Sequence, residues 1–240
     1  MEQAITFKTD GITFSGILHH PPGAAIAVVI GCHGLIADKN SPKQIALANR
    51  CTEAGLAYLR FDHRGCGQSG GDFANDTSLR NRCSDLLAAV GAIHRLLGRS
   101  APIGLFGSSF GGAVCLASAR IIKPFAMVTL ATPVESRSVH LPEDSPASLR
   151  AEIHQNRLKF SVSENLGDID HILVIHGEKD ETVSVSNARK IHRHAGNPKK
   201  LVILENGDHR ITDKSHQALV MDQATGWFVK HLDRSGISCW

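Results

Sequence analysis

The segment "GLFGSSFGGAV" (residues 104–114) holds a serine between two glycines, a pattern suited to a nucleophile. Gly107, Ser109 and Gly111 satisfy the spacing G-x-S-x-G. A nucleophile presented on a sharp turn between a strand and a helix has a strained backbone, and glycines two positions before and after it avoid clashes with neighbouring chain. A pattern centred on Ser108 would need glycines at 106 and 110, where phenylalanine stands in both places. The spacing therefore predicts Ser109 as the nucleophile and Ser108 as its neighbour.

A serine hydroxyl needs a base, and the base needs an acid that orients it. Asp180 follows the apolar run "HILVIHG", and His209 follows the run "KLVILENG". Both residues therefore fall just beyond expected strands, in the chain order serine, acid, histidine that goes with a G-x-S-x-G nucleophile. Glu178 and Asp208 are rival acids, but Asp208 adjoins the histidine and is expected to point away from it. The predicted catalytic residues are Ser109, Asp180 and His209.

Acyl transfer also requires donors for the oxyanion that develops on the substrate carbonyl. One predicted donor is the backbone N–H of Phe110, the residue after the nucleophile. The other is the N–H of Leu35, in the loop "CHGLIADKNSP" that follows the first buried run. His33 is interpreted as a residue that shapes this loop. The chemistry needs no cofactor and no metal, and the pairs His19-His20 and His192/His194 lack carboxylate or thiol partners at ligand spacing.

Strand-like and helix-like segments alternate along the chain, which predicts an α/β protein with a mostly parallel sheet of about eight strands and helices on both faces. Continuous or alternating apolar residues indicate strands, and apolar residues spaced three to four positions apart indicate helices. A hairpin is expected over 4–8 and 12–18, further strands over 25–34, 56–62, 102–107, 125–133, 171–177 and 200–207, and helices over 41–55, 79–98, 110–121, 184–196 and 216–232.

One segment interrupts this alternation, namely the polar stretch 134–168 with its two prolines. It is interpreted as a small cap inserted into a single domain of residues 1–240, with one helix around 146–160. Excursions that follow the carboxyl end of a strand build the sites of such sheets. We therefore expect 134–168, together with the loop 66–80, to line the substrate pocket.

Composition narrows the class of protein further. The 240 residues carry a formal charge of +3, with no cluster of lysine and arginine of the kind that nucleic-acid binding requires. The N-terminus has no signal-peptide pattern, and no apolar stretch approaches the ~18 residues of a membrane span. Six cysteines without a C-x-x-C pair suit a reducing compartment. These features predict a cytoplasmic protein with a small-molecule substrate and no nucleic-acid or membrane partner, and they leave a homo-oligomer open.

With these residues in hand, the chain resembles the α/β-hydrolase superfamily over almost its whole length. The stretch "FDHRGCGQSGG" (61–71) resembles the D-x-R-G-x-G-x-S segment common in that superfamily, and the "HGL", "HGEKDETV" and "NGDH" segments resemble its oxyanion, acid and histidine segments. The loop "HGLIADKNSP" and the short excursion are most similar to small carboxylesterases of the cinnamoyl/feruloyl esterase and serine-aminopeptidase-like group. The resemblance implies a serine carboxylesterase, with Asp62 and Arg64 fixing a loop.

Three alternatives stay open at this point. A peptidase or thioesterase would use the same three residues on a different bond, and an aminopeptidase would need acids such as Glu143, Asp144 and Glu152 to hold the substrate amine. A non-catalytic ligand-binding protein would have no need of a base and an acid placed to act on the serine. The polar excursion, and Tyr58 placed inside an apolar run, argue against a bulky phenolic ester as substrate.

Overall fold

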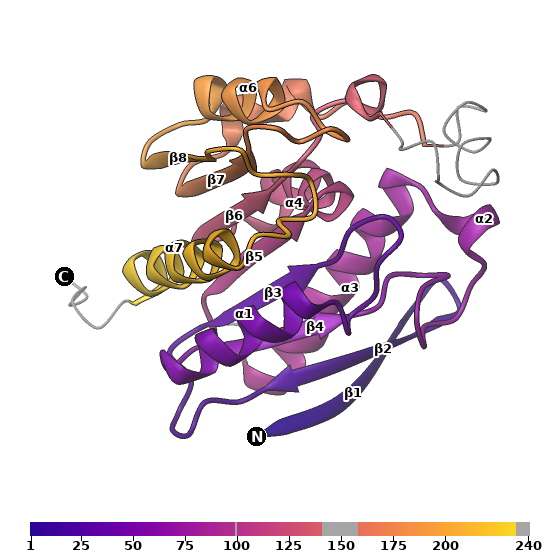
Figure 1. The fold of residues 1–240 in the computed structure, drawn as a ribbon. Helices are drawn as coiled ribbons and strands as arrows, with labels where there is room; N and C mark the ends of the chain where they lie inside the picture. The colour runs from indigo at the N-terminus through magenta and orange to yellow at the C-terminus, as the bar shows by residue number, and fades with distance from the viewer. Residues whose placement is uncertain (99, 141–157, 234–240) are drawn as a thin grey trace.

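The computed structural model describes residues 1–98, 100–140 and 158–233, and its centre is a single eight-stranded sheet (Figure 1). The strand order is β1-β2-β4-β3-β5-β6-β7-β8. Strands β1 and β2 form an antiparallel hairpin, β2 pairs antiparallel with β4, and every other pairing is parallel. The strands are β1 (Glu2–Thr9), β2 (Ile12–His19), β3 (Val28–Cys32), β4 (Ala57–Phe61), β5 (Ile103–Ser108), β6 (Ala126–Leu130), β7 (Ile172–Gly177) and β8 (Lys199–Leu204).

Helices cover both faces of this sheet (Figure 1). One face packs against α1 and α7, which also contact each other, and the other face packs against α3, α4 and α6. The helices are α1 (Pro42–Glu53), α2 (Phe73–Asp76), α3 (Leu79–Leu97), α4 (Phe110–Ile122), α6 (Ser186–His194) and α7 (Lys214–Leu232), with 3-10 turns η1 (Ser136–Ser138) and η2 (Ser163–Asp168).

The central strands are buried on both faces because helices lie above and below them. Every residue of β3, β4, β6 and β7 is buried, which accounts for their nearly continuous apolar sequences. Successive side chains along these strands point to opposite faces of the sheet and therefore belong to two separate hydrophobic clusters, one on each side. Tyr58 lies fully buried in the cluster under α1 and α7, as its apolar surroundings predicted.

The predicted fold class is confirmed, and the five predicted helices and eight strands lie where the periodicity placed them. The short helix α2 was not predicted; its N-cap is Asp72, whose side chain accepts a hydrogen bond from the backbone N–H of Asn75 at 2.8 Å. Most of the helix predicted over 146–160 lies outside the described residues. Across the described part of the chain, no helix has the length and apolar character needed to cross a membrane.

Parallel strands place their carboxyl ends at one edge of the sheet, and the predicted functional residues all follow such ends. The loop after β3 holds Leu35, the turn after β5 holds Ser109, and the loops after β7 and β8 hold Asp180 and His209. The fold therefore collects four segments that are far apart in sequence at one edge.

Candidate active site

Ser109 occupies a one-residue turn between β5 and α4, and its backbone has φ 53° and ψ −124°. A non-glycine residue with positive φ is strained, and such strain is held at functional sites by the surrounding structure. Here the Ser109 N–H donates a 2.8 Å hydrogen bond to the Leu130 carbonyl of the neighbouring strand β6. The turn leaves the hydroxyl of Ser109 on the cavity side of the sheet edge.

Three glycines make this turn sterically feasible. A Cβ on Gly107 would lie 2.5 Å from the Cα of Gly112, and a Cβ on Gly111 would lie 2.3 Å from the Cys32 carbonyl oxygen. The sequence pattern therefore identified both glycines for the correct reason. Gly112 was missed, although a Cβ there would lie 1.9 Å from Oγ1 of Thr132. Its signal was the doubled glycine "FGG", since the second glycine packs α4 against the strand end of β6.

Asp180 and His209 come together as a hydrogen-bonded pair. The Nδ1 atom of His209 lies 2.8 Å from Oδ2 of Asp180. The other carboxylate oxygen, Oδ1, accepts hydrogen bonds from the backbone N–H groups of Thr182 at 3.0 Å and Val183 at 2.7 Å. The carboxylate is fully buried, whereas the His209 side chain keeps 17% of its surface exposed toward the cavity. This arrangement fixes the imidazole with Nδ1 turned to the acid and Nε2 free.

His176, at the buried end of β7, is a further partner of Asp180 that the sequence analysis missed. Its Nε2 lies 3.1 Å from Oδ2 of Asp180 and 2.7 Å from the Val183 carbonyl. Burial alone would raise the pKa of Asp180, but hydrogen bonds from His176, His209 and the Val183 N–H outweigh it and hold that pKa far below its usual value. The available signal was a histidine inside an otherwise apolar strand, four residues before the acid.

The two rival acids are engaged elsewhere. The Glu178 carboxylate accepts a hydrogen bond from the Asn206 N–H at 3.1 Å. The Asp208 carboxylate accepts one from the backbone N–H of Thr212 at 2.8 Å and one from its hydroxyl at 2.7 Å. Asp208 therefore caps the turn that follows β8, and Asp180 alone of the three contacts the His209 ring.

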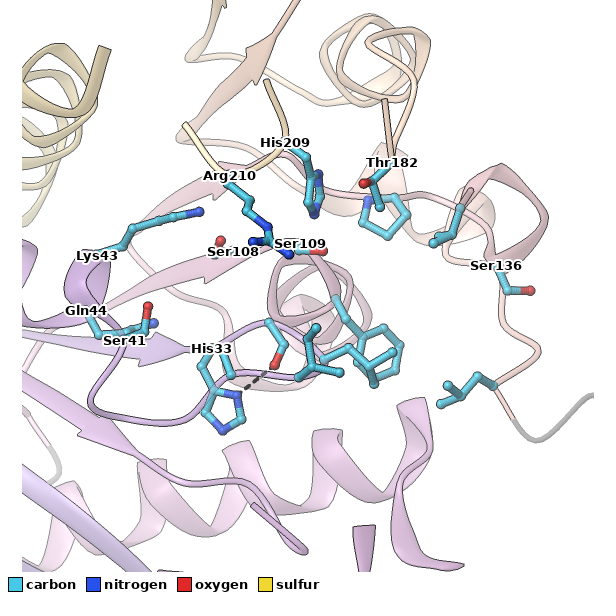
Figure 2. A pocket seen from close by; sticks show the side chains of 18 of the residues that line it. His33, Ser41, Lys43, Gln44, Ser108, Ser109, Ser136, Thr182, His209 and Arg210 are labelled. Carbon is cyan, nitrogen blue, oxygen red and sulfur yellow. Dashed lines mark hydrogen bonds between the residues drawn. The ribbon is translucent and has the colours of Figure 1, made fainter. Parts of the chain in front are cut away.

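Ser109 and His209 line one cavity of about 230 Å³ at the carboxyl edge of the sheet (Figure 2). Figure 2 shows the His209 ring extending into this space toward Ser109. The structure describes both Ser109 and His209, and it shows no hydrogen bond between their side chains. In ligand-free enzymes the hydrogen bond between nucleophile and base is often long and tightens only with substrate. Ser108 lines the cavity as well, as a neighbour of the turn.

The residues of the two predicted oxyanion donors line the same cavity as Ser109. Phe110 is the first residue of α4, so its N–H has no intrahelical acceptor. Leu35 lies in the loop after β3, and a buried guanidinium holds that loop: Arg82 of α3 donates to the Leu35 carbonyl at 2.9 Å and to the Gly34 carbonyl at 3.2 Å. The same guanidinium carbon lies 5.2 Å from the centre of the Phe110 ring. Arg82 thus contacts both candidate donor segments, and the sequence analysis missed it.

His33 takes part in the same loop through both ring nitrogens. Its Nδ1 lies 2.8 Å from the Gly34 carbonyl, and its Nε2 accepts a 3.0 Å hydrogen bond from the backbone N–H of His63. An acceptor at Nε2 requires the proton to be on Nδ1, which makes the ring neutral. Burial, together with the nearby His63 and Arg82, lowers the pKa of His33 well below its usual value. These contacts agree with the loop-shaping interpretation of this residue.

The segment 61–71 is tied down by Asp62 and Arg64, as the resemblance implied. Asp62 accepts hydrogen bonds from the backbone N–H groups of Lys39 at 2.7 Å and Gln68 at 2.8 Å. Arg64 donates from Nε to Asp85 at 2.7 Å. Both side chains are buried and lie outside the cavity lining.

The prediction that the loop 66–80 lines the pocket is wrong. No residue of this loop belongs to the described lining, which is formed instead by segments including the loop 33–44 and parts of the excursion. The reason is that the loop is tied to the hairpin side of the sheet. The Gly70 N–H donates to the Thr13 carbonyl at 2.9 Å, and the Ser69 hydroxyl donates to the Asp62 carbonyl at 2.7 Å.

The excursion contributes the apolar side of the cavity. Val139, Leu158 and Phe160 line it, and the Phe160 ring lies 5.3 Å from the ring of Phe110. Residues 141–157, which include the acids Glu143, Asp144 and Glu152, are outside the described residues. Within the described ranges, no group of three or more histidine, cysteine, aspartate or glutamate side chains is arranged to hold a metal ion.

A mostly parallel eight-stranded sheet, with helices on both faces and a strand–serine–helix turn at its carboxyl edge, defines an α/β hydrolase. The chain belongs to the serine aminopeptidase family S33, whose model matches residues 23–165, more than half of the sequence. It is therefore a hydrolase of the α/β serine hydrolase class.

Two relatives of known activity share about a quarter of their residues with this chain. The chain is 24% identical to a monoacylglycerol lipase from Mycolicibacterium smegmatis over 254 residues, covering 85% of this chain and 89% of the lipase. It is 25% identical to the mitochondrial palmitoyl-protein thioesterase ABHD10 of Bos taurus over 224 residues, covering 80% of this chain and 70% of that protein.

Solved structures share the fold. Est1E from Butyrivibrio proteoclasticus, with ferulic acid bound, superimposes with a TM-score of 0.81 at 21% identity, covering 95% of this chain and 99% of that one. The esterase Pf2001 of Pyrococcus furiosus superimposes with a TM-score of 0.79 at 17% identity, covering 97% and 93%. At these identities the likeness shows the fold alone, and function has to be argued from the site.

Proposed function

We propose that this hydrolase cleaves carboxylic esters through an acyl-enzyme on Ser109, with His209 as base and Asp180 as the acid that orients it. The observation that carries the proposal is the 2.8 Å contact between His209 and Asp180, in a cavity that Ser109 also lines. The strained backbone of Ser109 adds support, because it presents the hydroxyl at the start of α4.

In the first half-reaction, Oγ of Ser109 attacks the ester carbonyl carbon while Nε2 of His209 takes the hydroxyl proton. Asp180 remains ionised and stabilises the imidazolium that forms. The carbonyl oxygen becomes negatively charged and accepts hydrogen bonds from the N–H groups of Leu35 and Phe110. When the tetrahedral intermediate collapses, the C–O bond to the alcohol breaks and His209 gives its proton to the departing alkoxide.

In the second half-reaction, water replaces the alcohol. His209 takes a proton from the water, whose oxygen attacks the acyl carbon. The intermediate then collapses, releasing the carboxylic acid, and His209 returns the proton to Ser109. No step requires a metal ion or an organic cofactor.

Two observations bear on which bond is cleaved. The named relatives are a lipase and a thioesterase, which supports an ester or thioester over an amide. An aminopeptidase would need acids to hold the free amine of its substrate, and the described lining includes one acid, Glu181, beside two cations. A thioesterase is therefore the second candidate, because the same residues would serve a thioester without change.

The direct test is labelling with a fluorophosphonate probe, followed by hydrolysis of p-nitrophenyl acetate and butyrate. The native protein should be labelled, and Ser109→Ala should lose both labelling and at least 10³-fold in kcat, an order of magnitude typical for loss of a serine nucleophile. Ser108→Ala is the matched control, since the side chain is identical and lies one residue away; it should keep most activity.

Undiminished hydrolysis by Ser109→Ala would show that the nucleophile lies elsewhere. Complete loss in Ser108→Ala alone would reverse the choice between the two serines. A native protein that is folded but neither labelled nor active would instead be a non-catalytic ligand-binding protein. Butyryl thioesters and aminoacyl amides, compared with esters of equal acyl length, would identify the preferred bond.

A further inference from the structure

The cavity beside Ser109 has a cationic end formed by residues of α1 and the turn after β8. Lys43 and Arg210 both line it, and Figure 2 shows their side chains extending toward the same region. Within the described part of the chain, neither side chain forms an ion pair or a hydrogen bond. A cation that is partly removed from water is normally paired, so the unpaired, partly buried Lys43 requires an explanation, whereas the exposed Arg210 adds positive charge at the same end.

Lys43 is partly buried, which makes its lack of a partner costly. Removal from water lowers the pKa of its ammonium group, and the positive charge of Arg210 acts in the same direction, while Asp208 and Asp180 act against both. An ammonium that is partly removed from water and has no partner is destabilised relative to one in water. A bound anion would remove this cost, and the gain would appear as binding energy.

The acids near this end are committed to other groups. Asp180 is bound by His176 and His209, and Asp208 by the two donors of Thr212. Glu181, which also lines the cavity, is exposed and accepts a 3.3 Å hydrogen bond from the backbone N–H of His209. None of these carboxylates forms an ion pair with Lys43; Asp208 and Asp180 act on its charge only through space, and so the ammonium group itself has no contacting partner.

Neutral donors accompany the two cations. Gln44 lines the cavity with a side chain that is almost fully buried; its Oε1 accepts a 2.6 Å hydrogen bond from the Tyr58 hydroxyl, and its Nε2 has no hydrogen-bond partner among the described residues. Ser41 is the N-cap of α1, yet its side chain makes no capping hydrogen bond. An unsatisfied buried amide donor and the positive end of a helix both favour an acceptor with negative charge.

The other end of the cavity has the opposite character. Leu35, Phe110, Leu158 and Phe160 form an apolar surface there: Phe110 and Leu158 belong to one small buried cluster, and Leu35 and Phe160 pack against it. In Figure 2 the cationic residues lie on one side of Ser109 and Ser136 of the excursion lies on the other. A ligand that spans the cavity would therefore present an apolar part to one end and an anionic part to the other.

We infer that the end bounded by Ser41, Lys43, Gln44 and Arg210 is an anion subsite that binds a carboxylate of the substrate. The substrate class is then an ester whose acyl or alcohol part ends in a carboxylate. This inference rests on the proposed ester hydrolysis by Ser109. It also disfavours substrates with a free amine at this end, because like charges repel there.

Kinetics with matched pairs of esters tests the subsite. On the acyl side the pair is mono-4-nitrophenyl adipate and its methyl ester; on the alcohol side it is the butyrate ester of 4-hydroxybenzoate and that of methyl 4-hydroxybenzoate. Each pair differs only in one carboxylate. We expect kcat/KM to favour the free acid about tenfold in at least one pair, the gain expected of a charge-assisted contact. The pair that shows the preference identifies the side that the subsite binds.

Variants connect that preference to the named residues. Lys43→Met and Arg210→Gln should each lower the ratio of kcat/KM for the free acid to kcat/KM for the methyl ester toward one. Arg189→Gln is the matched control, because Arg189 is exposed on α6 and outside the cavity lining, and it removes the same charge. High salt should weaken the preference in the native protein. Equal kcat/KM for acids and methyl esters in both pairs would overturn the inference and leave ester hydrolysis standing.

A binding measurement keeps the subsite testable without turnover. In Ser109→Ala, titration calorimetry with 4-phenylbutyrate should give about tenfold tighter binding than with 4-phenylbutyramide, and Lys43→Met in the same background should abolish the difference. Equal affinity for the acid and the amide would overturn the subsite. Selective binding of the acid by a protein that hydrolyses no ester would support the subsite and refute the proposed chemistry.

Discussion

At the scale of single residues, the charge of Asp180 depends on more than its histidine partner. His176 approaches the same oxygen, Oδ2, that His209 contacts, and the backbone N–H groups of Thr182 and Val183 occupy Oδ1. A buried carboxylate is stable only when its acceptor sites are filled. His176 is therefore a positioning residue, which acts on catalysis through Asp180 and touches no substrate.

Replacing His176 with leucine should lower kcat for p-nitrophenyl butyrate about tenfold, because one donor to a charged group is lost and the pKa of Asp180 rises. KM should change little, since His176 does not line the cavity. His176→Gln, which keeps a donor of similar reach, should recover part of kcat. A leucine variant with native kcat and an unaltered pH–rate profile would show that His176 is only a packing residue.

At the scale of elements, the site is assembled where three segments meet around Arg82. This guanidinium is fully buried in α3, and it contacts the loop after β3 through Leu35 and Gly34 and the start of α4 through the Phe110 ring. It also lies 3.3 Å from Sγ of Cys66. No salt bridge pairs Arg82 within the described part of the chain, and its charge is stabilised by the carbonyl dipoles, the ring, the Cys66 thiol and the nearby charge of Asp85.

Replacing Arg82 with methionine should reduce kcat at least tenfold while KM for a neutral ester changes less than threefold. In this variant the Leu35 carbonyl loses its hydrogen-bond donor, so the loop that carries the Leu35 N–H is held less firmly. Complete loss of one oxyanion donor lowers kcat by about 10²–10³, which is the upper bound for this effect. Arg82→Lys should give an intermediate kcat, because an ammonium cannot reach two carbonyls as a planar fork does. Circular dichroism and melting temperature check folding. A folded methionine variant with native kcat would contradict this role.

At the scale of the whole molecule, patterns that depend on local chain geometry were predictable and contacts between distant segments were not. The period of apolar residues located the strands and helices, and the glycine spacing selected Ser109; the clash that Gly107 avoids lies within the turn, although the one that Gly111 avoids is with Cys32 of β3. His176 and Arg82 gave no comparable signal, because their partners are brought close only by the sheet order. The loop 66–80 was misplaced for the same reason, since its anchor is Thr13 on the distant hairpin.

The buried histidines predict how the stability of the whole molecule depends on pH. His33 and His63 are buried, and burial, together with neighbouring positive charge, lowers the pKa of each well below its usual value. Below about pH 6.5 the unfolded chain takes up a proton on each ring and the folded protein does not. The unfolded state then binds more protons, so the free energy of unfolding falls as the pH falls, by up to about 1.4 kcal/mol per pH unit for each histidine.

Of two buried carboxyl groups, Asp85 limits this effect without reversing it, and Asp180 acts outside the pH range considered. Burial raises the pKa of Asp85, which contacts His63, so this group contributes with the opposite sign, one against two. Asp180 has a lowered pKa and loses its stabilising contribution only below about pH 4, outside the relevant range. Urea unfolding at pH 7.5, 6.5 and 5.5 should therefore show midpoints that change little in the first step and fall clearly in the second. Equal midpoints at pH 6.5 and 5.5 would mean that His33 and His63 take up protons in the folded protein as well, and that the loop they support tolerates charge.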